Sequence, residues 1–155
     1  MKIIQLSDLH LTAGGEPLFG SSPRERLELA IDSILQSHAD ADFCLLTGDL
    51  ADAGRDAAYA ALADALRRLP MPAYLLPGNH DCRAALRRQF PQLPADGEFI
   101  QTAIDSPAGR FLLLDTVEAG APWGSYCAER REWLTRQLAA AGDLPRYLTA
   151  AAAME

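Results

Sequence analysis

The stretch MPAYLLPGNHD, residues 71–81, decides the fold, because an apolar run passes directly into turn-forming and polar residues. The run at 72–76 is too short for a helix and has the composition of a buried strand. Pro-Gly at 77–78 forms a turn, and the triplet Asn-His-Asp follows at 79–81. Since open α/β sheets bind ligands at the carboxyl ends of their strands, the stretch predicts a strand that delivers polar side chains to a site.

Two earlier apolar runs end in the same way. KIIQL at 2–6 leads into Ser-Asp-Leu-His, and the run at 42–50 ends in Thr-Gly-Asp-Leu. Helical patterns at 21–38, with Ser22 as N-cap, and at 55–69 separate the three runs. Successive β-α-β crossovers give parallel strands, so the sequence predicts an α/β fold with three strand ends at one edge of the sheet.

Polar side chains at these strand ends predict a metal site. The candidates are Asp8, His10, Asp49, Asn79, His80 and Asp81. Carboxylate, imidazole and amide donors together suit Mn, Fe or Zn, whereas all-oxygen sites suit Mg or Ca. Two cations about 3.5–4 Å apart, bridged by one carboxylate, can clamp the oxygens of a phosphoryl centre. We expect Asp49 to form the bridge, Asn79 to supply a neutral oxygen and His80 to face the substrate.

Composition excludes several classes of protein. The chain has 155 residues, 49% of them hydrophobic, which suits one ordinary core. A formal net charge of −7 opposes polynucleotide binding, because such proteins present basic surfaces to the phosphate backbone. No run has membrane-spanning length, and the start of the chain is too interrupted for a signal peptide. Three cysteines without a C-x-x-C pair favour reduced thiols, so we expect a cytoplasmic protein.

The second half of the chain is less informative. A short helix is expected at 83–90, a strand pair at 98–104 and 110–116, and a helix at 128–142. Asp115 is expected to be a turn or N-cap residue, and Arg130 to lie on the solvated face of the last helix. Residues 1–144 are therefore expected to form the domain. Residues 145–155 are expected to be an irregular Ala-rich tail.

The ordered motifs LSDLHL, TGDLAD, PGNHD and GRFLLLDT resemble the calcineurin-like metallophosphoesterase superfamily, closest to its class III cyclic-nucleotide phosphodiesterases. The resemblance extends over nearly the whole chain, up to about Leu144. It implies an α/β sheet with flanking helices that is C-terminally truncated relative to the full α/β/β/α sandwich of the family.

The resemblance also implies roles for the strand-end residues. Asp8 and His10 would bind the first metal, Asp49 would bridge, and Asn79 would bind the second metal. These ligands imply two divalent ions, which would be Mn, Fe or Zn.

Two further residues have roles in the family's chemistry. The histidine after the motif's Asn, here His80, would contact the phosphate and help the leaving group. The adjacent acid, here Asp81, would orient that histidine, as acids do for many imidazoles.

The family's later motifs, an H-H-x-P strand and a terminal G-H-x-H, are absent from the sequence. Its only histidines are His10, His38 and His80, so the second metal keeps only Asp49 and Asn79 and should bind weakly. The family's second sheet is also expected to be missing. Its loss would leave an apolar face undercovered, so self-association into a homo-oligomer is expected.

Three functional hypotheses follow. The first is a divalent-metal-dependent phosphodiesterase for small phosphodiesters, with cyclic AMP the favoured substrate. The second is a truncated, weakly active or inactive chain that binds a metal or a partner. In the third, another chain, identical or not, supplies the missing strands and histidines.

Overall fold

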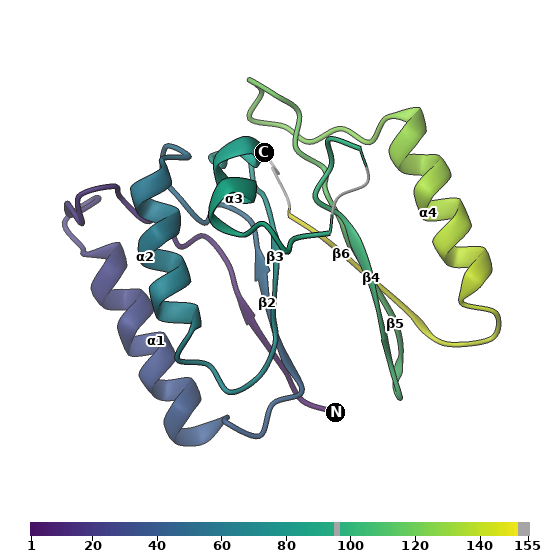
Figure 1. Ribbon diagram of the computed structural model, residues 1–155, viewed down its shortest axis with the longest axis horizontal. Coiled ribbons are helices and arrows are strands. Elements are labelled where there is room, and N and C mark those ends of the chain that lie inside the picture. Colours follow the sequence, from purple (N-terminus) through teal and green to yellow (C-terminus); the bar gives the residue numbers. More distant parts are fainter. Residues whose placement is uncertain (95–96, 152–155) are drawn as a thin grey trace.

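The computed structural model describes residues 1–94 and 97–151 and has four layers (Figure 1). Two three-stranded sheets face each other, with three helices outside the first sheet and one outside the second (Figure 1). This arrangement confirms the expected α/β class. Within the described residues, no helix combines the length and apolar character needed to cross a membrane.

The first sheet contains the three predicted parallel strands. They are β1 (Ile3–Leu6), β2 (Phe43–Thr47) and β3 (Ala73–Leu76), in the spatial order β1-β2-β3. The central strand β2 is buried along its whole length. Burial raises the pKa of the Cys44 thiol in β2 to about 11, so this cysteine remains a neutral core residue, as expected.

Three helices cover the outer face of this sheet: α1 (Pro23–Ser37), α2 (Asp56–Leu66) and α3 (Arg83–Gln89). The predicted N-cap is confirmed, because the Ser22 side chain accepts a hydrogen bond from the Glu25 N–H at 3.2 Å. The helices bury an apolar stripe against the sheet. In α1 the stripe includes Leu27, Ile31 and Ile34.

The expectation that the second sheet is missing is wrong. The predicted strand pair forms the hairpin β4 (Thr102–Ser106) and β5 (Gly109–Leu114), and α4 (Ala128–Ala140) then leads to β6 (Arg146–Ala150). β6 pairs in parallel with β5, so the expectation of an irregular segment from 145 is also wrong for 146–150. β6 is exposed and lacks an apolar alternation, so only its pairing with β5 shows that it is a strand. Residues 152–155 of the expected tail lie outside the described residues.

The two sheets bury the face that was expected to be undercovered. Phe43 and Leu45 of β2 pack with Phe111 and Leu113 of β5. The Phe43 and Phe111 rings meet edge to face, with their centroids 5.3 Å apart. The inner face of the first sheet therefore faces a second core layer and not solvent.

The outer edge of β6 has no partner strand among the described residues. Tyr147 is 43% exposed although its ring stacks on Phe111 at 4.5 Å, and Leu148 on the opposite face is 53% exposed. On each face of the second sheet, the apolar side chain at the β6 edge is therefore partly exposed to solvent. An open edge of this kind can pair with a further strand.

Candidate metal centre and substrate cavity

The loops that follow β1 and β2 run beside each other at the carboxyl edge of the first sheet. The Asp8 N–H donates to the Gly48 carbonyl at 3.2 Å, and the His10 N–H donates to the Asp49 carbonyl at 2.9 Å. A parallel bridge between Leu11 and Ala51 continues this pairing. These backbone contacts bring residues that are about forty positions apart into one site.

Three of the predicted metal ligands form one group of donor atoms. Asp8, His10 and Asp49 each offer a ligand atom, and these atoms all lie within 4.8 Å of one another. His10 Nε2 lies 4.0 Å from Asp49 Oδ2. His10 Nδ1 is buried and has no hydrogen-bond partner in the described part of the chain. Two carboxylates and an imidazole at this spacing fit a divalent cation.

All three residues have a left-handed backbone conformation. Their φ angles are 56° at Asp8, 45° at His10 and 50° at Asp49. For residues other than glycine this conformation costs about 1–2 kcal/mol and persists only where neighbouring contacts impose it. The hydrogen bonds between the two loops are such contacts, so the fold maintains an unfavourable backbone at these side chains.

The glycine in PGNHD has a steric role beside Asp49. A Cβ atom at Gly78 would lie 2.3 Å from the Asp49 nitrogen and 2.2 Å from Asp49 Oδ1. Any larger residue at this position would displace the predicted bridging carboxylate. The close approach of the two loops therefore requires glycine.

His80 lies beside this group of donors. Its backbone N–H donates to Asp49 Oδ1 at 3.0 Å, and its ring meets the His10 ring edge to face at 4.7 Å. His80 Nδ1 lies 2.8 Å from the Asp52 carbonyl oxygen and 3.9 Å from the Asp52 carboxylate. A cavity of about 540 Å³ is lined by Asp8, His10, Asp52 and His80. His80 thus lies at a cavity beside the donor group.

The expectation that Asp81 orients His80 is wrong. The Asp81 carboxylate accepts hydrogen bonds from the backbone N–H groups of Leu50 and Ala51 at 3.0 Å and of Gly78 at 2.8 Å. It also accepts a hydrogen bond from the Tyr59 hydroxyl at 2.8 Å. Burial raises the pKa of the Asp81 carboxyl, and the donated hydrogen bonds oppose that rise. Asp81 therefore links the loops after β2 and β3, and Asp52 is the acid beside His80.

Asp52 was the site residue that sequence reasoning did not select. It occupies the last position of the quoted TGDLAD motif, three residues after Asp49. Its own backbone is fixed by the Asp52 N–H donating to the Leu11 carbonyl at 3.1 Å. Asp52 also forms a second group of close donor atoms with His10 and His80. The TGDLAD motif therefore includes this acid. That Asp52 faces His80 depends on the pairing of the loops after β1 and β2, which the sequence does not show.

Asn79 lines a second cavity. That cavity, of about 420 Å³, is lined by Asn79, Arg83 and Glu118 among others. The next residue, His80, bonds Asp49 through its backbone, which places Asn79 close to the predicted bridge. Its role as a ligand of the second metal stays a prediction.

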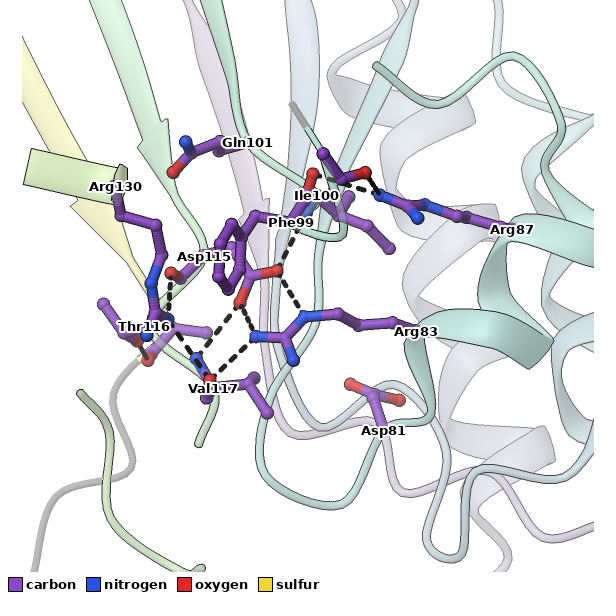
Figure 2. A network of polar contacts seen from close by, with 12 residues as sticks. Asp81, Arg83, Arg87, Phe99, Ile100, Gln101, Asp115, Thr116, Val117 and Arg130 are labelled. Atoms are coloured by element: carbon purple, nitrogen blue, oxygen red, sulfur yellow. Dashed lines mark hydrogen bonds and ion pairs between the residues drawn. The ribbon is translucent and has the colours of Figure 1, made fainter. Parts of the chain in front are cut away.

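Asp115 is the centre of a buried network between α3 and the second sheet (Figure 2). It is fully buried and accepts two hydrogen bonds from Arg83, both at 2.7 Å. It also accepts hydrogen bonds from the backbone N–H groups of Ile100 at 2.8 Å and Val117 at 3.1 Å. The expectation of a simple turn residue therefore missed a buried ion pair. Only the packing of α3 against the second sheet reveals it.

Arg130 lies on the other side of this network (Figure 2). The expectation that it belongs to a solvated face is wrong, because Arg130 is 2% exposed. Its guanidinium donates to the Asp115 and Val117 carbonyls at 3.0 and 3.2 Å and lies 4.4 Å from the centre of the Phe99 ring. A cation can be buried here because carbonyl oxygens and an aromatic face surround it.

A four-layer α/β/β/α arrangement with acidic and histidine donors at the strand ends defines the class of metallophosphoesterases. The chain belongs to the calcineurin-like phosphoesterase family, whose model matches residues 1–139. The family uses divalent metals, and the donor groups described above are its candidate sites in this chain.

Curated relatives of the chain are phosphodiesterases. The chain is 40% identical to a protein of Rhodopseudomonas palustris described as a probable cyclic nucleotide phosphodiesterase, with 96% of this chain and 56% of the relative covered. It is 33% identical to the 3′,5′-cyclic adenosine monophosphate phosphodiesterase of Escherichia coli, with 92% and 52% covered. A glycerophosphodiester phosphodiesterase of Enterobacter lignolyticus is 32% identical, with 94% and 54% covered. The chain spans about half the length of the curated relatives it matches.

A solved structure supports the fold independently. A purple acid phosphatase from yellow lupin seeds aligns with a TM-score of 0.56 at 17% identity, with 88% of this chain and 27% of that chain covered. This likeness shows that the two proteins share a fold.

Proposed function

We propose that the chain is the metal-binding portion of a divalent-metal-dependent phosphodiesterase that acts on small phosphodiesters. The observation that carries this proposal is the group of Asp8, His10 and Asp49 donors beside His80. Residues 1–144, together with β6, form this N-terminal portion of the enzyme. Asp8 and His10 would hold the first cation, Asp49 would be shared with the second, and Asn79 would supply an oxygen to the second.

His80 is the residue of this chain that acts on the substrate. A carbonyl oxygen can only accept a hydrogen bond, so His80 Nδ1 carries the hydrogen that is shared with Asp52. Nε2 is then available for the substrate, and in the imidazolium form it donates a proton to the departing ester oxygen. When bound, the cations act as Lewis acids on the phosphoryl group. Asp52 positions His80. Asp81 joins the loop after β2, which contains Asp49, to the loop after β3, which contains Asn79 and His80.

Cyclic nucleotides are the favoured substrates, with cyclic AMP first, because two of the relatives above are described as cyclic-nucleotide or cyclic-AMP phosphodiesterases. The glycerophosphodiester relative extends the class to other small phosphodiesters. Mn, Fe and Zn suit the mixed donors. The second cation binds weakly, because the sequence has no histidine after His80. Three unpaired cysteines at positions 44, 82 and 127 support a cytoplasmic location.

A second candidate function is a metal-binding module that becomes an efficient enzyme only when another chain completes its site. The open edge of β6, with Tyr147 and Leu148 partly exposed, favours this candidate. Pairing at this edge would extend the second sheet, and a second copy of the chain is one source of the added strand.

Hydrolysis of bis(p-nitrophenyl) phosphate and cyclic AMP tests the proposed function. We expect the protein to be inactive after a chelator has removed its metal ions and Mn²⁺ to restore turnover. The reason is that the protein ligands orient the phosphate only through a bound cation. The His38→Ala variant is the control, since His38 caps the end of α1 and lies outside the site. Mn²⁺ binding without turnover, together with a dimeric mass in solution, would favour the second candidate. Absence of both binding and turnover would contradict both.

A further inference from the structure

Phe19 is a fully exposed aromatic residue at the rim of the substrate cavity. Its relative exposure is 100%, the highest among the exposed large apolar residues of the described chain. Phe19 lines the same cavity of about 540 Å³ as Asp8, His10 and His80. The ring is not packed in the protein core, so its face is available to a ligand in this cavity.

A tight turn holds Phe19 in place. The backbone N–H groups and carbonyls of Leu18 and Ser21 exchange two hydrogen bonds, at 2.8 and 3.1 Å. Between them Phe19 has a φ of 50° and Gly20 a φ of 79°, the pattern of a type I′ turn. Asn, Asp or Gly is usual at the first of these two positions, and a bulky residue is costly there. The turn thus presents a ring at a position where a small polar residue would fold more easily.

Arg26, in the first turns of α1, lines the same cavity. Its side chain is exposed and forms no ion pair within residues 1–94 and 97–151. The rim therefore combines an unpaired cation with an aromatic ring, next to the carboxylate and imidazole donors. A phosphodiester carries one negative charge, which suits a cation that lines the same cavity as Asp8 and His10.

We propose that Phe19 determines substrate specificity by stacking on a planar aromatic group of the phosphodiester, while Arg26 attracts the anion. The proposal rests on the proposed function, because it names the substrate class of the same site. The cavity is of the size that binds a mononucleotide-sized ligand. Aromatic side chains stack on every base, so Phe19 selects phosphodiesters with a ring over purely aliphatic ones without selecting one base.

Binding of two phosphinates tests this role without relying on catalysis. Diphenylphosphinate and dimethylphosphinate are both tetrahedral monoanions whose phosphorus–carbon bonds a phosphodiesterase does not cleave. Calorimetric titration of the Mn²⁺-loaded protein should show diphenylphosphinate binding about tenfold more tightly than dimethylphosphinate. Phe19→Ala should remove this preference by weakening only the diphenyl ligand, and Phe19→Trp should retain it.

Leu29→Ala provides the matched control. Leu29 is a large apolar residue on α1 that is 68% exposed and does not line the cavity, so its loss should leave the preference unchanged. A preference that persists in Phe19→Ala, or a parent protein that lacks the preference or binds neither ligand, would overturn the proposal. Turnover of bis(p-nitrophenyl) phosphate by the same samples reports separately on the proposed function.

Discussion

Asp49→Ala is expected to lower Mn²⁺-dependent hydrolysis of bis(p-nitrophenyl) phosphate by more than about a hundredfold. Removal of residues that only support metal ligands typically costs about 10- to 100-fold, and Asp49 is a predicted ligand itself. Its carboxylate lies 4.0 Å from His10 Nε2 and accepts the His80 backbone N–H. Its loss therefore removes a metal donor and a contact that positions His80. Initial rates over a range of Mn²⁺ concentrations measure the effect.

Asp64→Ala is the matched control for this variant. Asp64 lies on α2, and its only described ion pair joins it to Arg67 at the surface. This variant should hydrolyse the substrate at the parent rate, and thermal unfolding should show that both variants are folded. Hydrolysis by Asp49→Ala at the parent rate would place the activity at another site or in a contaminant.

Asp115→Ala is expected to lower the free energy of unfolding by about 3–5 kcal/mol, because it leaves one partner of a buried ion pair uncompensated. Among the described residues, Arg83 would keep its hydrogen bond to the Val117 carbonyl, at 2.7 Å, and its contact with the Phe99 ring. The backbone N–H of Ile100 would also lose its acceptor in a buried position. Urea unfolding followed by circular dichroism measures the change.

The Asp64→Ala variant is again the control, now for stability. Its ion pair with Arg67 is exposed, with 64% and 70% of the two side chains accessible. Exposed pairs contribute about 0–1 kcal/mol, so the loss should be small. Equal losses for Asp115→Ala and Asp64→Ala would contradict the structural role given to the network in Figure 2.

The first half of the fold could be predicted because its signals are local. Each parallel strand is a mostly apolar run that is followed by turn-forming or polar residues, and each helix carries an apolar stripe. Parallel pairing then places Asp8, His10 and Asp49 at one edge of the sheet, which the structure bears out. Because neighbouring parallel strands end at the same edge of the sheet, no knowledge of long-range contacts is needed to predict that these residues lie close together.

Other features depend on tertiary contacts that the sequence does not display. Asp115 and Arg130 are charged, and a charged residue predicts exposure unless its partner is known. The partners of Asp115 and Arg130 lie on α3, in the segment before β4 and in the segment after β5. The strand β6 also depends on tertiary contacts, because four of its five residues are exposed and it is a strand only through pairing with β5.

The assignment of the acid beside His80 failed for a geometrical reason. Asp81 follows His80 in the sequence, but its carboxylate accepts hydrogen bonds from the Leu50 and Ala51 backbone and not from His80. Asp52 is separated from His80 by 28 positions, yet its carbonyl lies 2.8 Å from His80 Nδ1. Two residues that are adjacent in a turn do not necessarily direct their side chains toward each other.

The ends of β1 and β2 should bind Mn²⁺ directly through the His10 imidazole, together with Asp8 and Asp49. Pulsed electron paramagnetic resonance of the Mn²⁺-loaded chain tests this coordination most directly, because a histidine nitrogen bound to the ion produces a resolved ¹⁴N signal. We expect this signal in the parent protein and in His38→Ala, and we expect its loss in His10→Ala. Mn²⁺ bound to His10→Ala with an unchanged nitrogen signal would contradict a metal centre at these strand ends.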